Sequence, residues 1–301
     1  MQTTTMHTRA DVNTDTMNTL SDVSPMHSLA DVSPNSMHTL ADVSPSTMHA
    51  LPDVSSVTLN PATPIKPRIT VVIPTYNEAK NLVHVLPAIP DCVDEVILVD
   101  GNSRDGTVEV ARELMPNIIV IMQEGKKGKG DALKLGFAAA TGDIIVMIDA
   151  DGSTDPREIP TYIKPLLEGY AFAKGSRFMK GGGSFDITPL RRLGNLGLCW
   201  IVNVLYWRKF SDLCYGYNAF WRYCLDYIDV DCDGFEIETL IALRITKANY
   251  RVAEVPSYEY ERIHGESNLR TFRDGFRVLR TIMREFVKRV NPTTQIRHLF
   301  D

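Results

Sequence analysis

The sequence predicts an α/β fold with an open, doubly wound and mostly parallel sheet flanked by helices. Short β-branched runs alternate with helical segments from residue 68 onward, and the connections between them are short. This pattern is typical of parallel strands joined by crossover helices. Polar clusters follow three of the runs, as expected at the carboxyl ends of the strands, where such sheets bind their ligands.

Residues 68 to 149 contain four β-branched runs separated by three helical segments. Each run is short, apolar and bounded by turn residues, which favours a buried strand. Asp105 lies where a helix N-cap is expected, because its carboxylate can accept a backbone N–H of the first turn. The expected strands are 68–74, 94–100, 117–122 and 143–149, and the expected helices are 78–89, 105–115 and 129–140.

The second half is less regular and ends in a long amphipathic helix. We expect helices at 189–207 and 234–248, a strand at 251–260 and the final helix at 269–290. The first of these helices is too short in its apolar part to span a bilayer. Apolar residues at spacings of three and four form one stripe on the final helix, with arginines beside it. The stripe consists of Phe272, Phe276, Leu279, Met283 and Phe286. It either packs on the sheet or lies on an anionic membrane surface.

Residues 1–65 differ in composition from the rest and are expected to form a disordered, low-complexity tail before one folded domain at 66–301. Imperfect copies of "MHTLADVSP" begin at residues 6, 17, 26, 37 and 48. The tail carries one basic and six acidic residues, so the domain balances at 31 charges of each sign. A neutral domain gives no support for general nucleic-acid binding. Five cysteines without a C-x-x-C pair favour a reducing compartment.

Two aspartates follow the fourth strand in "IIVMIDADGSTDP" (144–156). Like charges at this spacing are unfavourable when half-buried, unless a cation or hydrogen bonds neutralise them. An EF-hand is excluded because Thr154 and Pro160 occupy the positions of its glycine and glutamate, and because a strand precedes. Asp149 and Asp151 suit Mg²⁺ or Mn²⁺ shared with substrate phosphates. The alternative is a turn that uses aspartate only for backbone hydrogen bonds.

A lysine-rich segment, "EGKKGKGDALKLG" (124–136), leads into the third helix. It is not a P-loop, because Gly130-Asp131 replaces Gly-Lys-Ser/Thr, and Leu133 replaces the third glycine of a dinucleotide fingerprint. Lysines near a helix start, such as Lys129, can still attract an anion. A solvated basic turn is the alternative.

Several segments occur in an order that resembles one known family. They are "VVIPTYNE", "ILVDGNSRDGT", "GKGDAL", "IDADGS", "GSRF", "SDLCYGYNAFWR", "GFEIETL" and "EVPSYEYERIHGESNL". Together they resemble family 2 glycosyltransferases, in particular the dolichol-phosphate (polyprenyl-phosphate) mannosyltransferase group, and the resemblance covers roughly residues 68 to 290. The resemblance implies the GT-A fold, a nucleotide-diphosphate sugar donor, a divalent metal and inversion at the anomeric carbon.

The resemblance also implies roles for individual residues. The donor side would be formed by Pro74, Tyr76, Glu78, Asp100, Lys129, Asp149 and Arg177. The metal would be held by Asp149 and Asp151. The acceptor phosphate would be held by Arg191, Arg192, Arg262, His264 and Ser267. Catalysis is expected to depend on Asp151, Arg192, Arg262 and Glu236. The chain has Gly101 where the family often has a second aspartate, and Asn268 where many relatives have lysine.

The acceptor determines whether a base is needed. A sugar hydroxyl must lose a proton to a carboxylate or histidine, whereas a lipid phosphate is already an anion and pairs with arginines. Arg191, Arg192, Arg222 and Arg262 lie in the acceptor half, which favours polyprenyl phosphate. Glu236 and Glu238 are candidate bases, or they orient these arginines.

We therefore expect an inverting, metal-dependent hexosyltransferase of cell-envelope glycan biosynthesis, with GDP-mannose as first and UDP-glucose as second donor. It would lie in the cytoplasm, peripherally at the inner face of the membrane, through its own helices or a membrane partner protein. The alternatives are a soluble family 2 transferase with a hydroxyl acceptor, a glycoside or polysaccharide, and a noncatalytic sugar-nucleotide binder.

Overall fold

A computed structural model of the chain describes residues 66–125, 128–265 and 269–288. The tail expected at 1–65 lies outside these residues. The described part forms a seven-stranded sheet with strand order β3-β2-β1-β4-β7-β5-β8, and a second sheet of β6 and β9. Neighbouring strands of the large sheet are parallel, except for the two pairs that β7 makes. The structure thus confirms the mostly parallel α/β sheet.

The strands and helices of the first half form where the sequence predicts them. Their bounds are β1 Ile69–Thr75, α1 Ala79–Val85, β2 Glu95–Asp100, α2 Thr107–Leu114, β3 Ile119–Met122, α3 Lys129–Ala139 and β4 Ile144–Met147. The N-cap of α2 is Gly106, at a φ of 86°, and not Asp105 as expected. Asp105 instead accepts hydrogen bonds from the backbone N–H groups of Thr107 and Ala79, at 3.1 and 3.0 Å. Its carboxylate therefore ties the start of α2 to the start of α1.

The second half contains more elements than the sequence predicts. Their bounds are α4 Ile159–Leu167, β5 Phe172–Ser176, β6 Gly183–Ser184, α5 Pro189–Tyr206, β7 Asn218–Trp221, α6 Ile237–Lys247, β8 Val252–Pro256, β9 Tyr258–Glu259 and α7 Thr271–Val287. The strand expected at 251–260 is divided into β8, which pairs with β5, and β9, which pairs with β6. Residues 289 and 290 of the expected final helix lie outside the described part.

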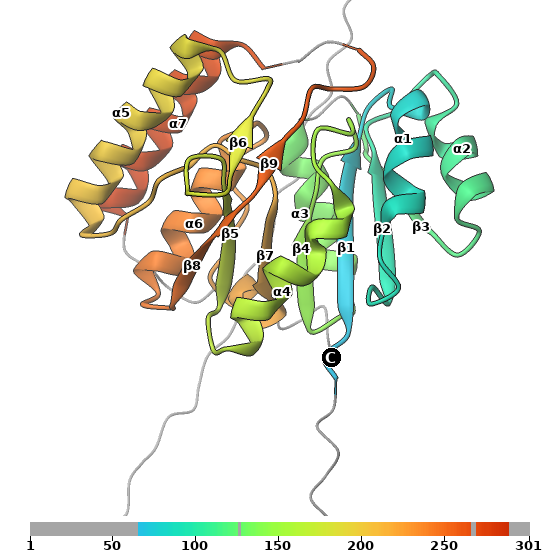
Figure 1. The fold of residues 1–301 in the computed structure, drawn as a ribbon, viewed down its shortest axis with the longest axis horizontal. Coiled ribbons are helices and arrows are strands. Elements are labelled where there is room, and N and C mark those ends of the chain that lie inside the picture. The colour runs from blue at the N-terminus through green and yellow to red at the C-terminus, as the bar shows by residue number, and fades with distance from the viewer. Residues whose placement is uncertain (1–65, 126–127, 266–268, 289–301) are drawn as a thin grey trace, which may run out of the picture. The chain divides into compact units, whose positions relative to one another are not determined.

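Two apolar cores cover the two faces of the large sheet. Alternate side chains of a strand point to opposite faces, so Val72 packs in one core, with residues of α3 and α6, whereas Val71 and Ile73 pack in the other, with residues of α1 and α4. Helices on both faces leave the carboxyl ends of the parallel strands open for a site. Figure 1 shows these helices around the sheet, and α5 and α7 side by side at one end of the molecule.

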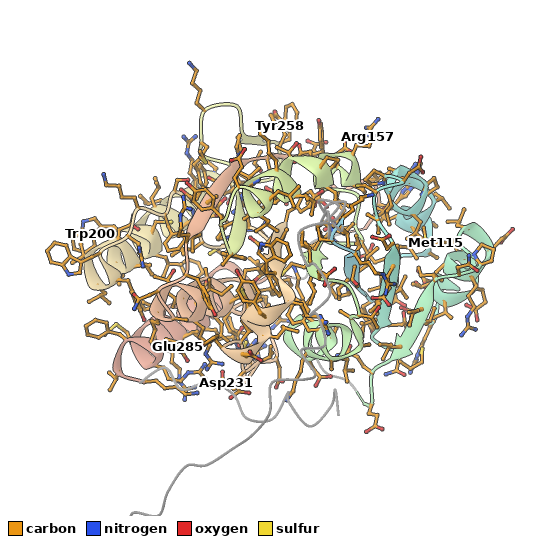
Figure 2. All side chains as sticks on the ribbon, turned by 90° about the horizontal axis from the view of Figure 1, so that it is seen from below. Met115, Arg157, Trp200, Asp231, Tyr258 and Glu285 are labelled. Atoms are coloured by element: carbon orange, nitrogen blue, oxygen red, sulfur yellow. The ribbon has the colours of Figure 1, made fainter. Side chains whose placement is uncertain are left out.

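Helix α7 turns a mainly polar face inward. Its buried residues are Asp274, Val278, Thr281, Ile282 and Glu285. The apolar stripe faces outward, with Phe272 80% and Phe276 68% exposed. The alternative in which this stripe packs on the sheet is therefore wrong. Figure 2 shows Glu285 close to Asp231, whereas Trp200 of α5 projects away from the body of the molecule.

Helix α5, which packs beside α7, also exposes apolar residues. Leu193 and Trp200 of α5 are each 68% exposed, and Trp207 follows directly after the helix with its side chain in solvent. We call the outward-facing apolar residues of the two helices the α5–α7 face. It consists of Leu190, Leu193, Leu196, Trp200, Val204, Phe272, Phe276, Met283, Phe286 and Val287. Within the part of the chain that the structure describes, no helix combines the length and the apolar character needed to cross a bilayer.

Candidate active site

Polar loops after β1, β2 and β4 meet at one edge of the sheet, as the sequence predicts. Because these three strands are parallel neighbours, their carboxyl ends lie side by side. Glu78 follows β1, Gly101 follows β2, and Asp149 and Asp151 follow β4, and all four line the same pocket. We call this cavity the donor-side pocket.

The donor-side pocket contains most of the residues expected to bind a nucleotide sugar. Pro74, Tyr76 and Glu78 line it from the end of β1. Asp100 is an exception, since it is fully buried and is not among the lining residues. Its carboxylate accepts hydrogen bonds from the backbone N–H and the hydroxyl of Ser103, at 2.8 and 2.6 Å. Asp100 therefore shapes the loop after β2.

Lys129, which lines the donor-side pocket, joins two carboxylates. Its Nζ lies 2.5 Å from Asp149 Oδ1 and 2.7 Å from Glu238 Oε1. Burial opposes the charge on Lys129, but the two carboxylates outweigh burial and hold the pKa of the ammonium above its usual value. Burial raises the pKa of Glu238, and Lys129 offsets this only in part. Lys129 is thus a buried counter-ion and not part of a solvated basic turn.

Glycines allow the start of α3 to approach the chain before α6. The backbone N–H of Gly130 donates to the carbonyl of Asp233 at 3.0 Å. A Cβ at Gly128 or Gly130 would overlap the carbonyl oxygens of Asp233 and Cys232. The "GKG" segment therefore places Lys129 between Asp149, which follows β4, and Glu238 of α6.

Asp151 is paired with Arg262 from the loop after β9. Arg262 Nη2 lies 2.6 Å from Asp151 Oδ2, and Nη1 lies 3.5 Å from Glu78 Oε1. The backbone N–H of Ile263 donates to the carbonyl of Asp151 at 3.4 Å, which fixes this loop against the turn after β4. Burial raises the pKa of Glu78 above its ordinary value.

A second cavity, the acceptor-side pocket, lies on the other side of the aspartates. It shares Lys129, Asp149, Asp151 and Arg262 with the donor-side pocket. Arg191 and Leu198 line it from α5, and Asp274 and Val278 line it from α7. Arg191 Nη2 donates to the carbonyl of Leu269 at 3.3 Å, and Nη1 lies 3.7 Å from Asp186 Oδ2. The pocket thus extends from the aspartates to the space between the two helices.

Arg177 lines the acceptor-side pocket, whereas the family resemblance implies a place on the donor side. Its guanidinium makes two hydrogen bonds to Asp212, at 2.7 and 3.1 Å, and an ion pair with Glu259 at 3.1 Å. It also lies over the ring of Tyr215, 5.0 Å from the centroid. Two carboxylates hold Arg177 rigidly in the wall of the pocket.

Several expected acceptor residues lie elsewhere. Arg192 is exposed and lies over the ring of Phe178, and its neighbour Arg191 faces the pocket instead. His264 is exposed, outside both pocket linings, and Ser267 lies outside the described residues. Arg222 follows antiparallel β7, and its backbone N–H donates a hydrogen bond to the carbonyl of Asp143, which precedes β4. It therefore lies at the edge of the sheet opposite to the aspartates.

The two glutamates of "GFEIETL" have different positions. Glu238 lies in the acceptor-side pocket and binds Lys129, whereas Glu236 is buried and lines neither pocket. Glu236 immediately precedes α6, so the two side chains project in different directions from the first turn. The expectation that Glu236 contributes to catalysis therefore has no support from its position.

Two groups of lining residues were missed in the sequence. Gln123 follows edge strand β3, lines the donor-side pocket and donates to the carbonyl of Gly128 at 3.2 Å. Its position after a predicted parallel strand was an available signal. Thr271 and Asp274 of α7 line the acceptor-side pocket, and no sequence signal indicated this, because the turn of α7 about its axis is set by packing.

Comparison with known proteins identifies the family. The sequence model described as glycosyl transferase family 2 matches residues 70–226. The chain belongs to this family. The matched region includes the donor-side carboxylates Glu78, Asp149 and Asp151, whereas α6 and α7 lie beyond it.

Two curated relatives are similar to this family 2 glycosyltransferase over most of its folded part. Glycosyltransferase AglJ of Haloferax volcanii is 33% identical over 220 residues, which are 70% of each chain. A dolichol-phosphate mannosyltransferase of Pyrococcus furiosus is 32% identical over 211 residues, 67% of this chain and 59% of that relative. The resemblance to the polyprenyl-phosphate mannosyltransferase group is thereby confirmed.

A solved structure has the same fold. Glucosyl-3-phosphoglycerate synthase of Mycobacterium tuberculosis, in complex with Mn²⁺, UDP and glucosyl-3-phosphoglycerate, aligns with a TM-score of 0.58. The alignment covers 73% of this chain and 80% of that chain at 23% identity. At this identity the likeness shows the fold alone, and it confirms the GT-A-type sheet.

Proposed function

We propose that this family 2 glycosyltransferase moves a sugar from a nucleotide-diphosphate sugar to a polyprenyl phosphate, with inversion. One observation carries the choice of acceptor. The carboxylates that line the acceptor-side pocket, as far as the chain is described, each have a cationic partner. These pairs are Asp149 and Glu238 with Lys129, Asp151 with Arg262, Asp186 with Arg191, Glu259 with Arg177, and Asp274 with Arg277.

An adjacent cation stabilises the ionised form of a carboxylate and weakens it as a general base. Glu238 keeps a raised pKa through burial, but Lys129 occupies its carboxylate at 2.7 Å. A hydroxyl acceptor requires a general base, whereas a phosphate acceptor arrives ionised and requires cations. Arg191, Arg262 and Lys129 line the pocket, but among the described lining residues six carboxylates outnumber four cations. A divalent metal at Asp149 and Asp151 would have to supply the remaining positive charge. The pocket chemistry therefore favours an anionic acceptor oxygen, and the α5–α7 face next to it is suited to the lipid tail of that acceptor.

The donor is proposed to bind in the donor-side pocket, with its nucleoside against Pro74 and Tyr76. GDP-mannose is the first choice, in keeping with the name of the Pyrococcus relative, and UDP-glucose is the second. A GT-A neighbour was solved with UDP-glucose and Mn²⁺, which supports a nucleotide-sugar donor for this fold. The diphosphate would then lie beside Lys129.

A divalent metal fits the two aspartates. Their carboxylates are hard oxygen ligands at the junction of the two pockets, and both already attract protein cations. Among the described residues no cluster of three or more candidate ligands occurs, so phosphate oxygens and water would complete the coordination. When bound, Mg²⁺ or Mn²⁺ would stabilise the negative charge of the leaving diphosphate. Lys129 orients Asp149, and the backbone N–H of Ser153 orients Asp151 at 2.9 Å.

We propose that the protein reaches its acceptor from the cytoplasmic surface of the membrane. The α5–α7 face presents Trp200 and Phe272 to solvent, and Arg273 and Arg280 of α7 lie exposed beside the stripe. Burial of such aromatics at the membrane interface and attraction of arginines to anionic headgroups act together. A membrane partner protein would be an alternative occupant of the same face.

A transferase with a hydroxyl acceptor is the second candidate, and Asp186 is the observation that favours it. Its distance to Arg191, 3.7 Å, is the longest of the pairs above, and its side chain is 43% exposed. Of these carboxylates, it is the one best placed to accept a proton from a hydroxyl group.

The decisive experiment is incubation of the protein with GDP- and UDP-sugars, Mn²⁺ or Mg²⁺, and either polyprenyl phosphate or simple glycosides. Mass spectrometry then identifies the product. We expect a polyprenyl-phosphate sugar, and we expect Arg191→Gln to reduce its formation while Arg112→Gln on exposed α2 does not. Formation of a glycoside, lost in Asp186→Asn, would instead establish the second candidate.

A further inference from the structure

Arg262 occupies the junction between the donor-side and acceptor-side pockets. Its guanidinium pairs with Asp151 at 2.6 Å and with Glu78 at 3.5 Å, and it lines both cavities. The guanidinium thus neutralises two carboxylates that repel each other in a half-buried site. Without a cation between them, this arrangement would be unfavourable.

Arg262 holds the oxygen of Asp151 that a ligand would use. The backbone N–H of Ser153 binds Oδ1 at 2.9 Å, and Arg262 binds Oδ2. A cation that approaches Asp151 from the pockets therefore competes directly with the guanidinium. Lys129 is different, because both of its carboxylates lie within 2.7 Å and its side chain is 11% exposed, whereas Arg262 is 21% exposed and its second carboxylate, Glu78, lies 3.5 Å away.

The loop that carries Arg262 is anchored through its backbone. Tyr260 N–H donates to the carbonyl of Ser153 at 2.8 Å, and Ile263 N–H donates to the carbonyl of Asp151. Ile263 also packs on Gly152, where an added Cβ would lie 2.7 Å from Ile263 Cδ1. The side chain of Arg262 can therefore change partner by rotation, while its backbone stays in place.

We propose that Arg262 is a built-in counter-ion of the free enzyme, which the metal and the donor diphosphate displace from Asp151. This inference rests on the proposed function. The displaced guanidinium remains in the lining of the acceptor-side pocket, where its charge is available to an acceptor phosphate. The acceptor site is thus completed only after the donor binds, and this gives the reaction an order of binding. Before the donor binds, Arg262 is paired with Asp151 and Glu78 and is not available to an acceptor anion.

Metal binding without nucleotide tests the inference directly. Mn²⁺ must displace Arg262 in the wild type but not in Arg262→Gln, so the variant is expected to bind Mn²⁺ roughly ten- to a hundredfold more tightly. Arg191→Gln removes the same charge from the acceptor-side pocket without touching Asp151. It is the matched control and should change the affinity by about twofold or less. The Mn²⁺ affinities of the wild type and the two variants are measured by titration, with free Mn²⁺ detected by electron paramagnetic resonance.

Arginine side-chain NMR gives a second readout, independent of turnover. The guanidinium signal of Arg262, assigned by its loss in Arg262→Gln, should shift when Mg²⁺ and UDP or GDP are added to the wild type. If Arg262→Gln is unstable, Arg262→Lys should show an intermediate gain in Mn²⁺ affinity, because an ammonium cannot span both carboxylates.

The outcomes separate this inference from the proposed function. Suppose that the wild type binds Mn²⁺ together with a nucleoside diphosphate. If Arg262→Gln then binds Mn²⁺ without nucleotide no more tightly than the wild type does, Arg262 is not a displaceable counter-ion. An Arg262 signal that does not move on addition of Mg²⁺ and nucleotide leads to the same conclusion. If no nucleoside diphosphate binds the wild type with either metal, the proposed function itself fails.

Discussion

Arg244 of α6 and Glu285 of α7 form a two-point ion pair inside the molecule, with Nε 3.1 Å from Oε2 and Nη2 2.8 Å from Oε1. Asp231 binds the same guanidinium at 2.9 Å. Because this pair fixes which side of α7 is buried, the aromatic stripe of the helix is left in solvent. The α5–α7 face thus depends on a buried charge.

Glu285→Gln is expected to lower the free energy of unfolding by about 3 kcal/mol, because it leaves the buried Arg244 with less compensation. For a folded part of this size, the thermal midpoint should fall by roughly 6–12 °C. Calorimetry measures the change. Glu113→Gln on the exposed side of α2 is the control, and an equal loss in both variants would exclude the ion pair as an anchor.

The same pair predicts that stability decreases in acid. Burial raises the pKa of Glu285, but Arg244 outweighs burial, so the pKa lies below the ordinary 4.5, and that of Asp231 lies below 3.8 for the same reason. A carboxyl with a lowered pKa stabilises the fold above its unfolded pKa and loses this effect as the pH falls. The difference in stability between wild type and Glu285→Gln should be constant above about pH 5 and shrink below 4.5. A difference that grows in acid would contradict this sign.

Asp151→Asn is expected to abolish transfer and leave the fold intact. Loss of one carboxylate weakens the hold on the metal at the leaving diphosphate, and kcat should fall by about a hundredfold or more. A product assay with metal present, together with circular dichroism, measures both effects. Asp91→Asn, in an exposed loop, is the control. Near-normal turnover of Asp151→Asn would remove the metal assignment.

Residues 1–60 are expected to be dispensable for catalysis. Their repeats contain too few apolar residues to form a core. Deletion should leave both the thermal midpoint and the rate of transfer almost unchanged. A large loss of either would indicate that this segment docks on the folded domain.

Binding to anionic vesicles should depend on the α5–α7 face. Replacement of Arg273 and Arg280 by Gln is expected to weaken binding about thirtyfold at low salt, from about 1 kcal/mol for each arginine near the headgroups. Phe272→Ser should weaken binding at every salt concentration, because apolar burial is not screened. Arg277 and Arg284 are left unchanged, since they pair with Asp274 and Asp231.

Vesicle flotation measures this binding. Arg104→Gln with Arg112→Gln, two exposed positions before and within α2, is the charge-matched control. If the wild type does not bind anionic vesicles even at low salt, the α5–α7 face serves another partner. A transferase with a hydroxyl acceptor then becomes the stronger candidate function.

Local sequence determined the first half of the fold and the centre of the site. β-Branched runs ending in polar loops specify buried parallel strands, and parallel strands bring their carboxyl ends together. Asp149, Asp151 and Glu78 could therefore be placed near one another from the sequence. The family resemblance added Arg262, which the loop after β9 brings to Asp151 across more than a hundred residues.

Tertiary structure alone decided the second half of the site. Arg191 rather than Arg192, and Glu238 rather than Glu236, reach the pocket because the rotation of α5 and α6 is set by packing against other elements. Antiparallel β7, which the sequence did not predict, carries Arg222 to the opposite edge. On α7 the apolar stripe left open whether it packs on the sheet or lies on a membrane surface, and the buried pair of Arg244 and Glu285 turned that stripe to solvent. Periodicity reveals that a helix has two faces, and only the partners across the interface determine which one is buried.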